Sequence, residues 1–207
     1  MNRTRLIGGF AAAAVILSVA AAAAPAASAA NTGTASLASV LTSGKQGFDQ
    51  DYKDYDIVTA AVLAVLKANP NSPVKALTDG KTALTAFIPT DQAFIDLASA
   101  LSKKKVTSEA DAFKVVAGLG IPTVEKVLEY HVVPGPAIMS GDALKANGAK
   151  LKTALAGKTI GVTVVAKPAS ITLVDSAKPY PKVILTQVDI NKGNMQVAHG
   201  IDAVLMP

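Results

Sequence analysis

The sequence predicts an α+β fold in which helices, mainly in the first half, pack with a small β-sheet region formed mainly by the second half. Two observations predict it. Before Gly135, apolar residues recur at helical spacing between capping and breaking residues, whereas later runs are rich in Val, Ile and Thr and are separated by turn residues. Alternating βα units are missing, so the layers should be segregated.

The first thirty residues are predicted to be a signal peptide. MNRTR carries two arginines, an apolar run extends from Leu6 to Ala24, and small residues follow it. We expect cleavage after Ala29 or Ala30, and hence a secreted or extracellular protein with no integral membrane span after cleavage. Residues 31–207 should form a single domain, with the motif-bearing core at 36–207.

Charge argues against a nucleic-acid partner. Two of the 20 basic residues are the arginines of the leader, so 18 lysines face 15 acidic residues and the net charge of the remainder is +3. Arginine, which supplies the bidentate fork for phosphate and guanine, is otherwise absent from the sequence. Lys103, Lys104 and Lys105 are therefore interpreted as a solvated helix end.

Helical patterns open the chain after the leader. A short helix is expected around Ser36 to Leu41. A buried helix over IVTAAVLAVLKA follows, and Asp56 can cap its first turn. Pro70 and Pro73 end this helix because proline cannot continue the hydrogen-bond ladder.

A strand, a cap and three helical segments are expected next. LTAFIP, Leu84 to Pro89, predicts a short strand, and Thr90 or Asp91 caps the helix after it. Four apolar residues at i, i+3, i+4 and i+7 form one face of that helix, namely Phe94, Leu97, Ala98 and Leu101. Further helices run from a Ser108 and Asp111 capping box to about Val116, and from Pro122 to His131.

The second half is expected to contain strands. Val, Ile and Thr dominate Thr159 to Ala166, Ser170 to Val174 and Val183 to Ile190. Lys192-Gly193-Asn194 should join the last of these to Met195 to Met206 as a hairpin.

Both histidines of the chain lie on apolar faces. His131 shares a helix face with Val127 and Leu128. His199 shares one face of a strand with Met195, Val197 and Ile201. A histidine on such a face is usually a neutral, hydrogen-bonded core ring, so we favour a structural role over a catalytic or ligand role.

No catalytic or metal-binding motif is complete. The sequence lacks G-x-S-x-G, H-E-x-x-H, a dinucleotide fingerprint and any cysteine. The acidic stretch FDQDYKDYD does not fit a calcium loop, because Lys53 stands where an oxygen ligand belongs and the Gly-and-Glu pattern is lacking. We interpret it as a solvated acidic loop and expect no metal, no cofactor and no enzyme.

Three segments together resemble the fasciclin domain family, also called FAS1 or beta-Ig-h3 domains. They are TAFIPTDQAF, from Thr85 to Phe94, LEYHVVPG, from Leu128 to Gly135, and HGIDAVLMP, from His199 to Pro207. The chain departs from the family at Gly200, where a branched apolar residue is usual, and its FDQDYKDYDIVTAAV segment resembles bacterial single-domain members.

The resemblance implies a compact α+β wedge that is usually extracellular and serves adhesion or protein binding rather than catalysis. It also implies that the Tyr-His motif and the two flanking boxes meet in the core. Six residues, called the motif residues below, are carried over as structural or partner-binding: Thr90, Asp91, Tyr130, His131, His199 and Asp202.

We therefore expect a secreted, non-catalytic adhesion or protein-binding module that is a monomer. Its partner is an unknown extracellular or cell-surface protein or glycan. One alternative is a carrier of a small apolar ligand. Another is an exported hydrolase that uses Tyr130 and His131 with Asp91 or Asp202 as the carboxylate.

Overall fold

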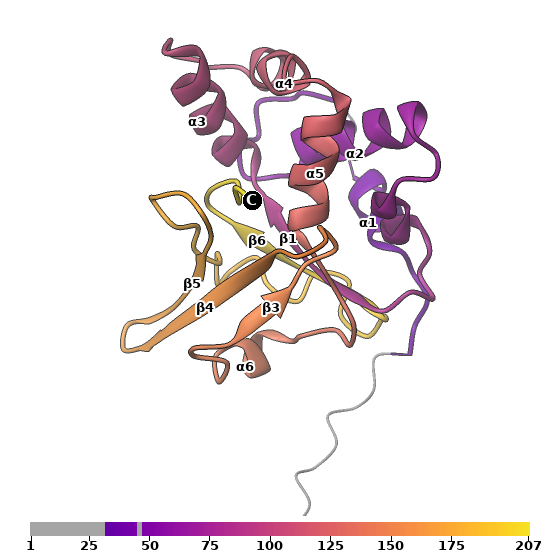
Figure 1. The fold of residues 1–207 in the computed structure, drawn as a ribbon, viewed down its shortest axis with the longest axis vertical. Coiled ribbons are helices and arrows are strands. Elements are labelled where there is room, and N and C mark those ends of the chain that lie inside the picture. Colours follow the sequence, from indigo (N-terminus) through magenta and orange to yellow (C-terminus); the bar gives the residue numbers. More distant parts are fainter. Residues whose placement is uncertain (1–31, 45–46) are drawn as a thin grey trace, which may run out of the picture. The chain divides into compact units, whose positions relative to one another are not determined.

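The computed structural model describes residues 32–44 and 47–207, and the predicted signal peptide lies outside them (Figure 1). The helices are mostly in the first half of the chain and the strands mostly in the second, which confirms the predicted α+β class. The helices are α1 Leu37–Thr42, α2 Asp56–Ala68, the 3₁₀ helix η1 Pro73–Thr78, α3 Asp91–Ser102, α4 Glu109–Ala117, α5 Ile121–Tyr130 and α6 Ser140–Ala143. The strands are β1 Leu84–Pro89, β2 Val132–Pro134, β3 Lys150–Lys152, β4 Thr159–Ala166, β5 Ala169–Val174 and β6 Gln196–Ile201.

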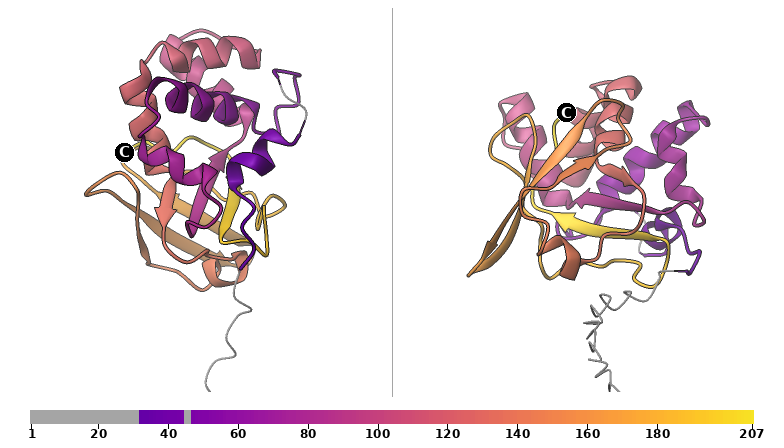
Figure 2. Two further views of the ribbon diagram at one scale, coloured as in Figure 1. Left: turned by 90° about the vertical axis from the view of Figure 1, so that its right-hand side faces the viewer. Right: turned by 60° about the horizontal axis from the view of Figure 1, so that its bottom comes forward.

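The strands form two three-stranded sheets. In the first, β1 is central, pairs antiparallel with β2 and pairs parallel with β6 in the order β2-β1-β6. The second is the antiparallel sheet β3-β4-β5. In the views of Figure 2, helices α1 to α5 gather on the side away from this second sheet.

Strand β1 lies between two apolar clusters. Leu84, Ala86 and Ile88 belong to the cluster formed with the helices, whereas Phe87 belongs to the cluster formed with β4 and β5. Because successive side chains of a strand point to opposite faces, a strand covered on both sides is mostly apolar, as LTAFIP is apart from Thr85. All six residues of β1 are buried.

Side-chain caps set the starts of α1, α3 and α4, and the last two were predicted. The Ser36 and Thr90 side chains accept hydrogen bonds from Ser39 N–H and Ala93 N–H at the starts of α1 and α3. Ser108 Oγ accepts from Asp111 N–H and donates to the Asp111 carboxylate, which completes the predicted capping box at α4.

Asp56 does not cap helix α2, and that prediction was wrong. Asp56 is the first residue of the helix, and its Oδ2 has no hydrogen-bond partner. The N–H groups of Asp56 and Ile57 instead donate to Asp91, at 3.2 Å to Oδ2 and 2.9 Å to Oδ1. The carboxylate of Asp91, from α3, thus accepts the free N–H groups at the start of α2.

The strand predicted over Val183 to Ile190 is not formed either. Among the described residues this segment meets its neighbours only at isolated bridges, including Val183 with Ile201 and Ile190 with Ala198. The intervening residues turn instead of extending, since Gln187 N–H bonds to Ile184 C=O and Asp189 has a positive φ of 57°. They still contact β6, because Ile184 N–H donates to Gly200 C=O and Gly200 N–H donates to Gln187 C=O. The hairpin with β6 is therefore only partial.

In the described part of the chain, no helix is long and apolar enough to cross a bilayer.

Candidate functional site

Pairing of β1 with its two neighbours brings the three family-like segments together. β1 belongs to the first segment, β2 to the second and β6 to the third. Phe87 N–H donates to His131 C=O at 2.9 Å, and Thr90 N–H donates to Ile201 C=O at 3.2 Å. The motif segments are thus joined through the backbone of the central sheet, as the family resemblance implied.

His131 is a buried strut between α5 and the C-terminal segment. Its Nδ1 lies 2.6 Å from Val127 C=O, and its Nε2 accepts the N–H of Leu205 at 3.0 Å. Only 5% of its surface is exposed. Burial lowers the pKa of His131 to about 4, although the hydrogen bond to Val127 acts in the opposite direction.

Tyr130 and His131 point into different parts of the core. The Tyr130 ring belongs to the cluster with β4 and β5, and its hydroxyl donates to Thr159 C=O at 3.0 Å. Burial raises the pKa of this hydroxyl. The two neighbouring side chains therefore do not form a hydroxyl–imidazole pair of the kind that the hydrolase alternative needs.

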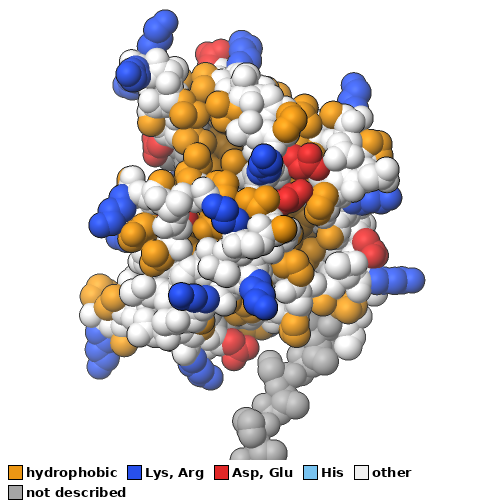
Figure 3. Space-filling view, viewed as in Figure 1, with side chains coloured by type: hydrophobic (Ala, Val, Ile, Leu, Met, Phe, Trp, Pro, Cys, Tyr) orange, Lys and Arg blue, Asp and Glu red, His pale blue; other side chains and the backbone are white. Residues whose placement is uncertain are grey.

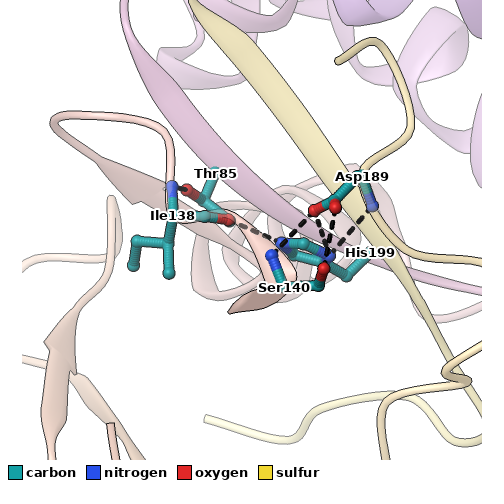
Figure 4. A network of polar contacts seen from close by, with 5 residues as sticks. All are labelled: Thr85, Ile138, Ser140, Asp189 and His199. Atoms are coloured by element: carbon teal, nitrogen blue, oxygen red, sulfur yellow. Dashed lines mark hydrogen bonds and ion pairs between the residues drawn. The ribbon is translucent and has the colours of Figure 1, made fainter. Parts of the chain in front are cut away.

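His199 takes part in a second network of polar contacts (Figure 4). Its Nε2 donates to Ile138 C=O at 2.8 Å, and its Nδ1 accepts the N–H of Asp189 at 3.3 Å. The Asp189 carboxylate accepts both the N–H and the hydroxyl of Ser140, at 2.8 and 2.7 Å. Ile138 N–H in turn donates to the Thr85 hydroxyl at 2.8 Å.

This network holds a serine, a carboxylate and a histidine in an order that does not activate the serine. A catalytic triad places the imidazole between the hydroxyl and the carboxylate. Here the Asp189 carboxylate binds the Ser140 hydroxyl, and both nitrogens of His199 are used by backbone groups. The network therefore anchors the Ile138–Ser140 loop to β6.

Thr90 and Asp91 cap two different helices, α3 and α2 respectively. Asp91 has no exposed surface. Burial, followed by a hydrogen bond to Asp54, raises the pKa of its carboxyl to about 8, although the N–H of Ile57 favours the charged form.

Asp202 lies at the surface, where its Oδ1 accepts the N–H of Lys182 at 2.7 Å. Neither this carboxylate nor that of Asp91 contacts His131.

An apolar groove opens between helices α3, α4 and α5 and the C-terminal segment. Figure 3 shows hydrophobic side chains gathered over these helices. The groove has a volume of about 150 Å³ and exposes only apolar atoms, with His131 among its lining residues. Leu101 and Leu119, 45% and 40% exposed, also line it. Large exposed leucines beside an apolar hollow are typical of a contact surface.

Several buried polar residues were not found from the sequence. Glu109 is 1% exposed and lies with Asp54 and Asp91 in a carboxylate cluster that could hold a metal ion. The Gln196 amide accepts the N–H of Leu37 and donates to the carbonyls of Ala76, Asp79 and Thr82. In the sequence, Glu109 is recognisable only as an acidic residue in the first turn of a predicted helix. No sequence pattern indicates the role of Gln196.

A model of one protein family matches most of the chain. The Fasciclin domain model matches residues 59–207. No curated protein matches the chain. A similar solved structure is the FAS1 domain pair from the insect cell adhesion molecule fasciclin I, with 18% sequence identity and a TM-score of 0.45.

That match covers 70% of this chain and 44% of the domain pair, so the chain spans less than half of the solved protein. The family model, by contrast, includes all three of the segments that meet on the central sheet. The chain belongs to the fasciclin domain family.

Proposed function

We propose that this chain is a secreted, non-catalytic adhesion module that binds an extracellular or cell-surface protein through its apolar groove. Fasciclin domains are associated with cell adhesion. The observation that carries the proposal is the groove itself, which exposes only apolar atoms beside two exposed leucines. A glycan would need convergent polar groups, so the lining favours a protein that inserts an apolar side chain.

The charges beside the groove indicate which kind of protein would bind there. Lys103, Lys104 and Lys105 are exposed and begin two residues after Leu101. Among the described residues, the one ion pair formed by a lysine joins Lys114 to Asp111, so these three lysines are not neutralised by the chain. A partner with acidic residues beside its apolar anchor would complement this edge.

A non-catalytic role is supported by the hydrogen bonds that both histidine rings make to the backbone. All four ring nitrogens face backbone groups at hydrogen-bonding distance. A general base needs a ring nitrogen free to accept a proton from a reacting group. Neither His131 nor His199 offers one.

The experiment is affinity capture from extracellular fractions with residues 31–207 as bait, compared across matched leucine variants. Leu101→Gln and Leu119→Gln change the groove, whereas Leu63→Gln changes a leucine that is 50% exposed on α2 and does not line it. We expect the captured protein to be retained by the wild type and by Leu63→Gln and lost from both groove variants. Equal capture by all four proteins would contradict the proposal.

A carrier of a small apolar ligand is the second candidate function, because the groove has no exposed polar atoms. Its volume of about 150 Å³ is that of a cavity that holds benzene, whereas pockets for drug-sized ligands are about 300–1,000 Å³. The size therefore suits a single side chain better than a whole lipid. Native mass spectrometry of the purified protein tests this, since repeated co-purification of a lipid would favour the carrier.

A further inference from the structure

Acidic residues from three separate elements meet beside the start of helix α2. Asp54 lies in the loop before α2, Asp91 is the first residue of α3, and Glu109 is the first residue of α4. Each offers one carboxylate oxygen, and the three oxygens lie within 4.8 Å of one another. Asp54 also belongs to a second such group, with Asp49 and Asp56, on the more exposed side.

The buried carboxylate of Glu109 has no hydrogen-bond partner. Glu109 is 1% exposed, and neither of its oxygens makes a hydrogen bond. The backbone N–H groups of Gln50 and Asp49 favour its charged form but do not reach hydrogen-bonding geometry, and burial, the larger effect, raises its pKa. Asp54 Oδ1 and Asp56 Oδ2 are also buried without partners.

The described residues supply no cationic side chain to this cluster. Within residues 32–44 and 47–207, the ion pairs are Lys114 with Asp111 and a histidine contact with Asp189, both outside the cluster. A buried carboxylate without a counter-charge or hydrogen bonds is strongly unfavourable. Something other than a described side chain must therefore neutralise these groups.

We propose that Asp54, Asp91 and Glu109 form a binding site for a hard divalent cation, best matched by Ca²⁺. Carboxylate oxygens are the preferred ligands of this ion, which binds them at about 2.3–2.6 Å in flexible geometry. Two ligands on opposite sides of such an ion are then about 4.8 Å apart, which is the limit within which the three oxygens already lie. Each oxygen of Asp91 accepts one N–H from α2 and keeps a second lone pair for the ion.

The site differs from a calcium loop because its ligands do not come from one stretch of sequence. The ion would tie α3 and α4 to the loop that leads into α2. Calcium should therefore stabilise the fold whether or not the apolar groove binds a partner. The alternative to a bound calcium ion is protonation of the cluster. In that case Asp54 and Asp91 share one proton and Glu109 carries another.

Thermal unfolding and calorimetric titration of metal-free protein at pH 7.5 separate these two cases. We expect one Ca²⁺ per chain and a rise in the unfolding midpoint on the order of 5 to 10 °C at a hundredfold excess over Kd. Mg²⁺, which demands a stricter octahedral shell, should act more weakly. Absence of binding heat and of a midpoint shift with millimolar Ca²⁺ would overturn the proposal.

Isosteric variants locate the ion. Glu109→Gln and Asp54→Asn should each weaken Ca²⁺ binding at least tenfold, and in metal-free protein each should raise the unfolding midpoint because like charges are removed. Asp111→Asn is the matched control, since Asp111 lies on the same helix as Glu109 but pairs with Lys114. If both cluster variants keep the calcium response of the wild type, the ion is not bound here. If the midpoint rises in these variants without any calcium response in the wild type, protons neutralise the cluster and the proposal fails.

Terbium gives a direct optical readout of the same site. Tb³⁺ replaces Ca²⁺ at oxygen sites, and excited tyrosines transfer energy to it when they are close. Tyr52 and Tyr55 flank Asp54 in the sequence. We expect tyrosine-sensitised emission from the wild type and from Asp111→Asn, and its loss from Glu109→Gln. Emission that is unchanged in Glu109→Gln would contradict the site.

Discussion

The imidazole of His131 accepts the backbone N–H of Leu205 at 3.0 Å, across 74 positions of sequence. On the other side of the ring, Nδ1 lies 2.6 Å from Val127 C=O. A carbonyl oxygen can only accept and a backbone N–H can only donate, so Nδ1 carries the proton and Nε2 is the acceptor. The ring thereby links the end of α5 to the end of the chain.

Replacing this ring removes two hydrogen bonds and opens a hole beside the groove. We expect His131→Ala to lower the free energy of unfolding by about 1 to 3 kcal/mol, because Leu205 N–H and Val127 C=O lose their partner. Urea unfolding measures the loss. A variant as stable as the wild type would contradict the role of His131 as a strut.

The same ring makes stability depend on pH. Burial lowers the pKa of folded His131 to about 4 from an ordinary value of 6.5, so the unfolded chain binds its proton first. This contribution is complete above pH 6.5 and is lost as the pH falls towards 4, by at most about 3 kcal/mol. Asp91, whose pKa is raised, acts in the opposite direction. The difference in unfolding free energy between wild type and His131→Ala isolates the effect and should shrink over that range.

The two histidines should be opposite tautomers. His199 donates from Nε2 to Ile138 C=O and accepts the N–H of Asp189 at Nδ1, the reverse of His131. Nitrogen-15 NMR of the imidazole rings at pH 7 should show a neutral Nδ1–H form for His131 and a neutral Nε2–H form for His199. A charged ring, or the same tautomer in both, would refute the assigned hydrogen bonds.

Gly200 leaves room for a contact that a side chain would displace. A Cβ atom at this position would lie 2.5 Å from the Tyr55 hydroxyl and 2.8 Å from Gln187 Oε1, which are hydrogen-bonded to each other at 3.1 Å. We expect Gly200→Ala to destabilise the protein by about 1 to 3 kcal/mol, since extra volume forces its neighbours to move.

A double-mutant cycle tests this cause. Tyr55→Phe removes the nearest obstructing atom at the cost of one hydrogen bond, about 1 kcal/mol. The double variant should lose less stability than the two single variants together, as measured by urea unfolding. Strict additivity would show that the tyrosine hydroxyl is not what excludes a side chain from position 200.

Gly200 also explains a departure from the family. The space that a branched apolar residue would fill on β6 is taken by the tyrosine of the acidic, aromatic segment before α2. Gln187 Nε2 also donates to Lys53 C=O at 2.9 Å, so that segment is held against β6. The elaborated segment and the missing side chain are two parts of one packing arrangement.

Local signals in the sequence were sufficient to predict most of the helices and strands before Gly135. The starts of α3 and α4 were predicted because Thr90 and Ser108 act on N–H groups three residues away. The cap of α1 at Ser36 was not predicted, although a short helix was expected there. Burial of both histidines was also predicted, since periodicity alone places them on apolar faces. The predicted strand over Val183 to Ile190 failed because the chain turns between its isolated bridges, which composition does not reveal.

The sequence by itself determined the α+β class, the starts of α3 and α4 and the apolar faces, because these depend on contacts within a few residues. Only the tertiary structure decided that Asp91 caps α2 rather than α3, that the two histidines take opposite tautomers, and that Glu109 joins Asp54 in a buried cluster. Each of these depends on groups far apart in the chain, whose meeting is set by how the helices and sheets pack. The apolar groove has the same origin, since no single helix contains it.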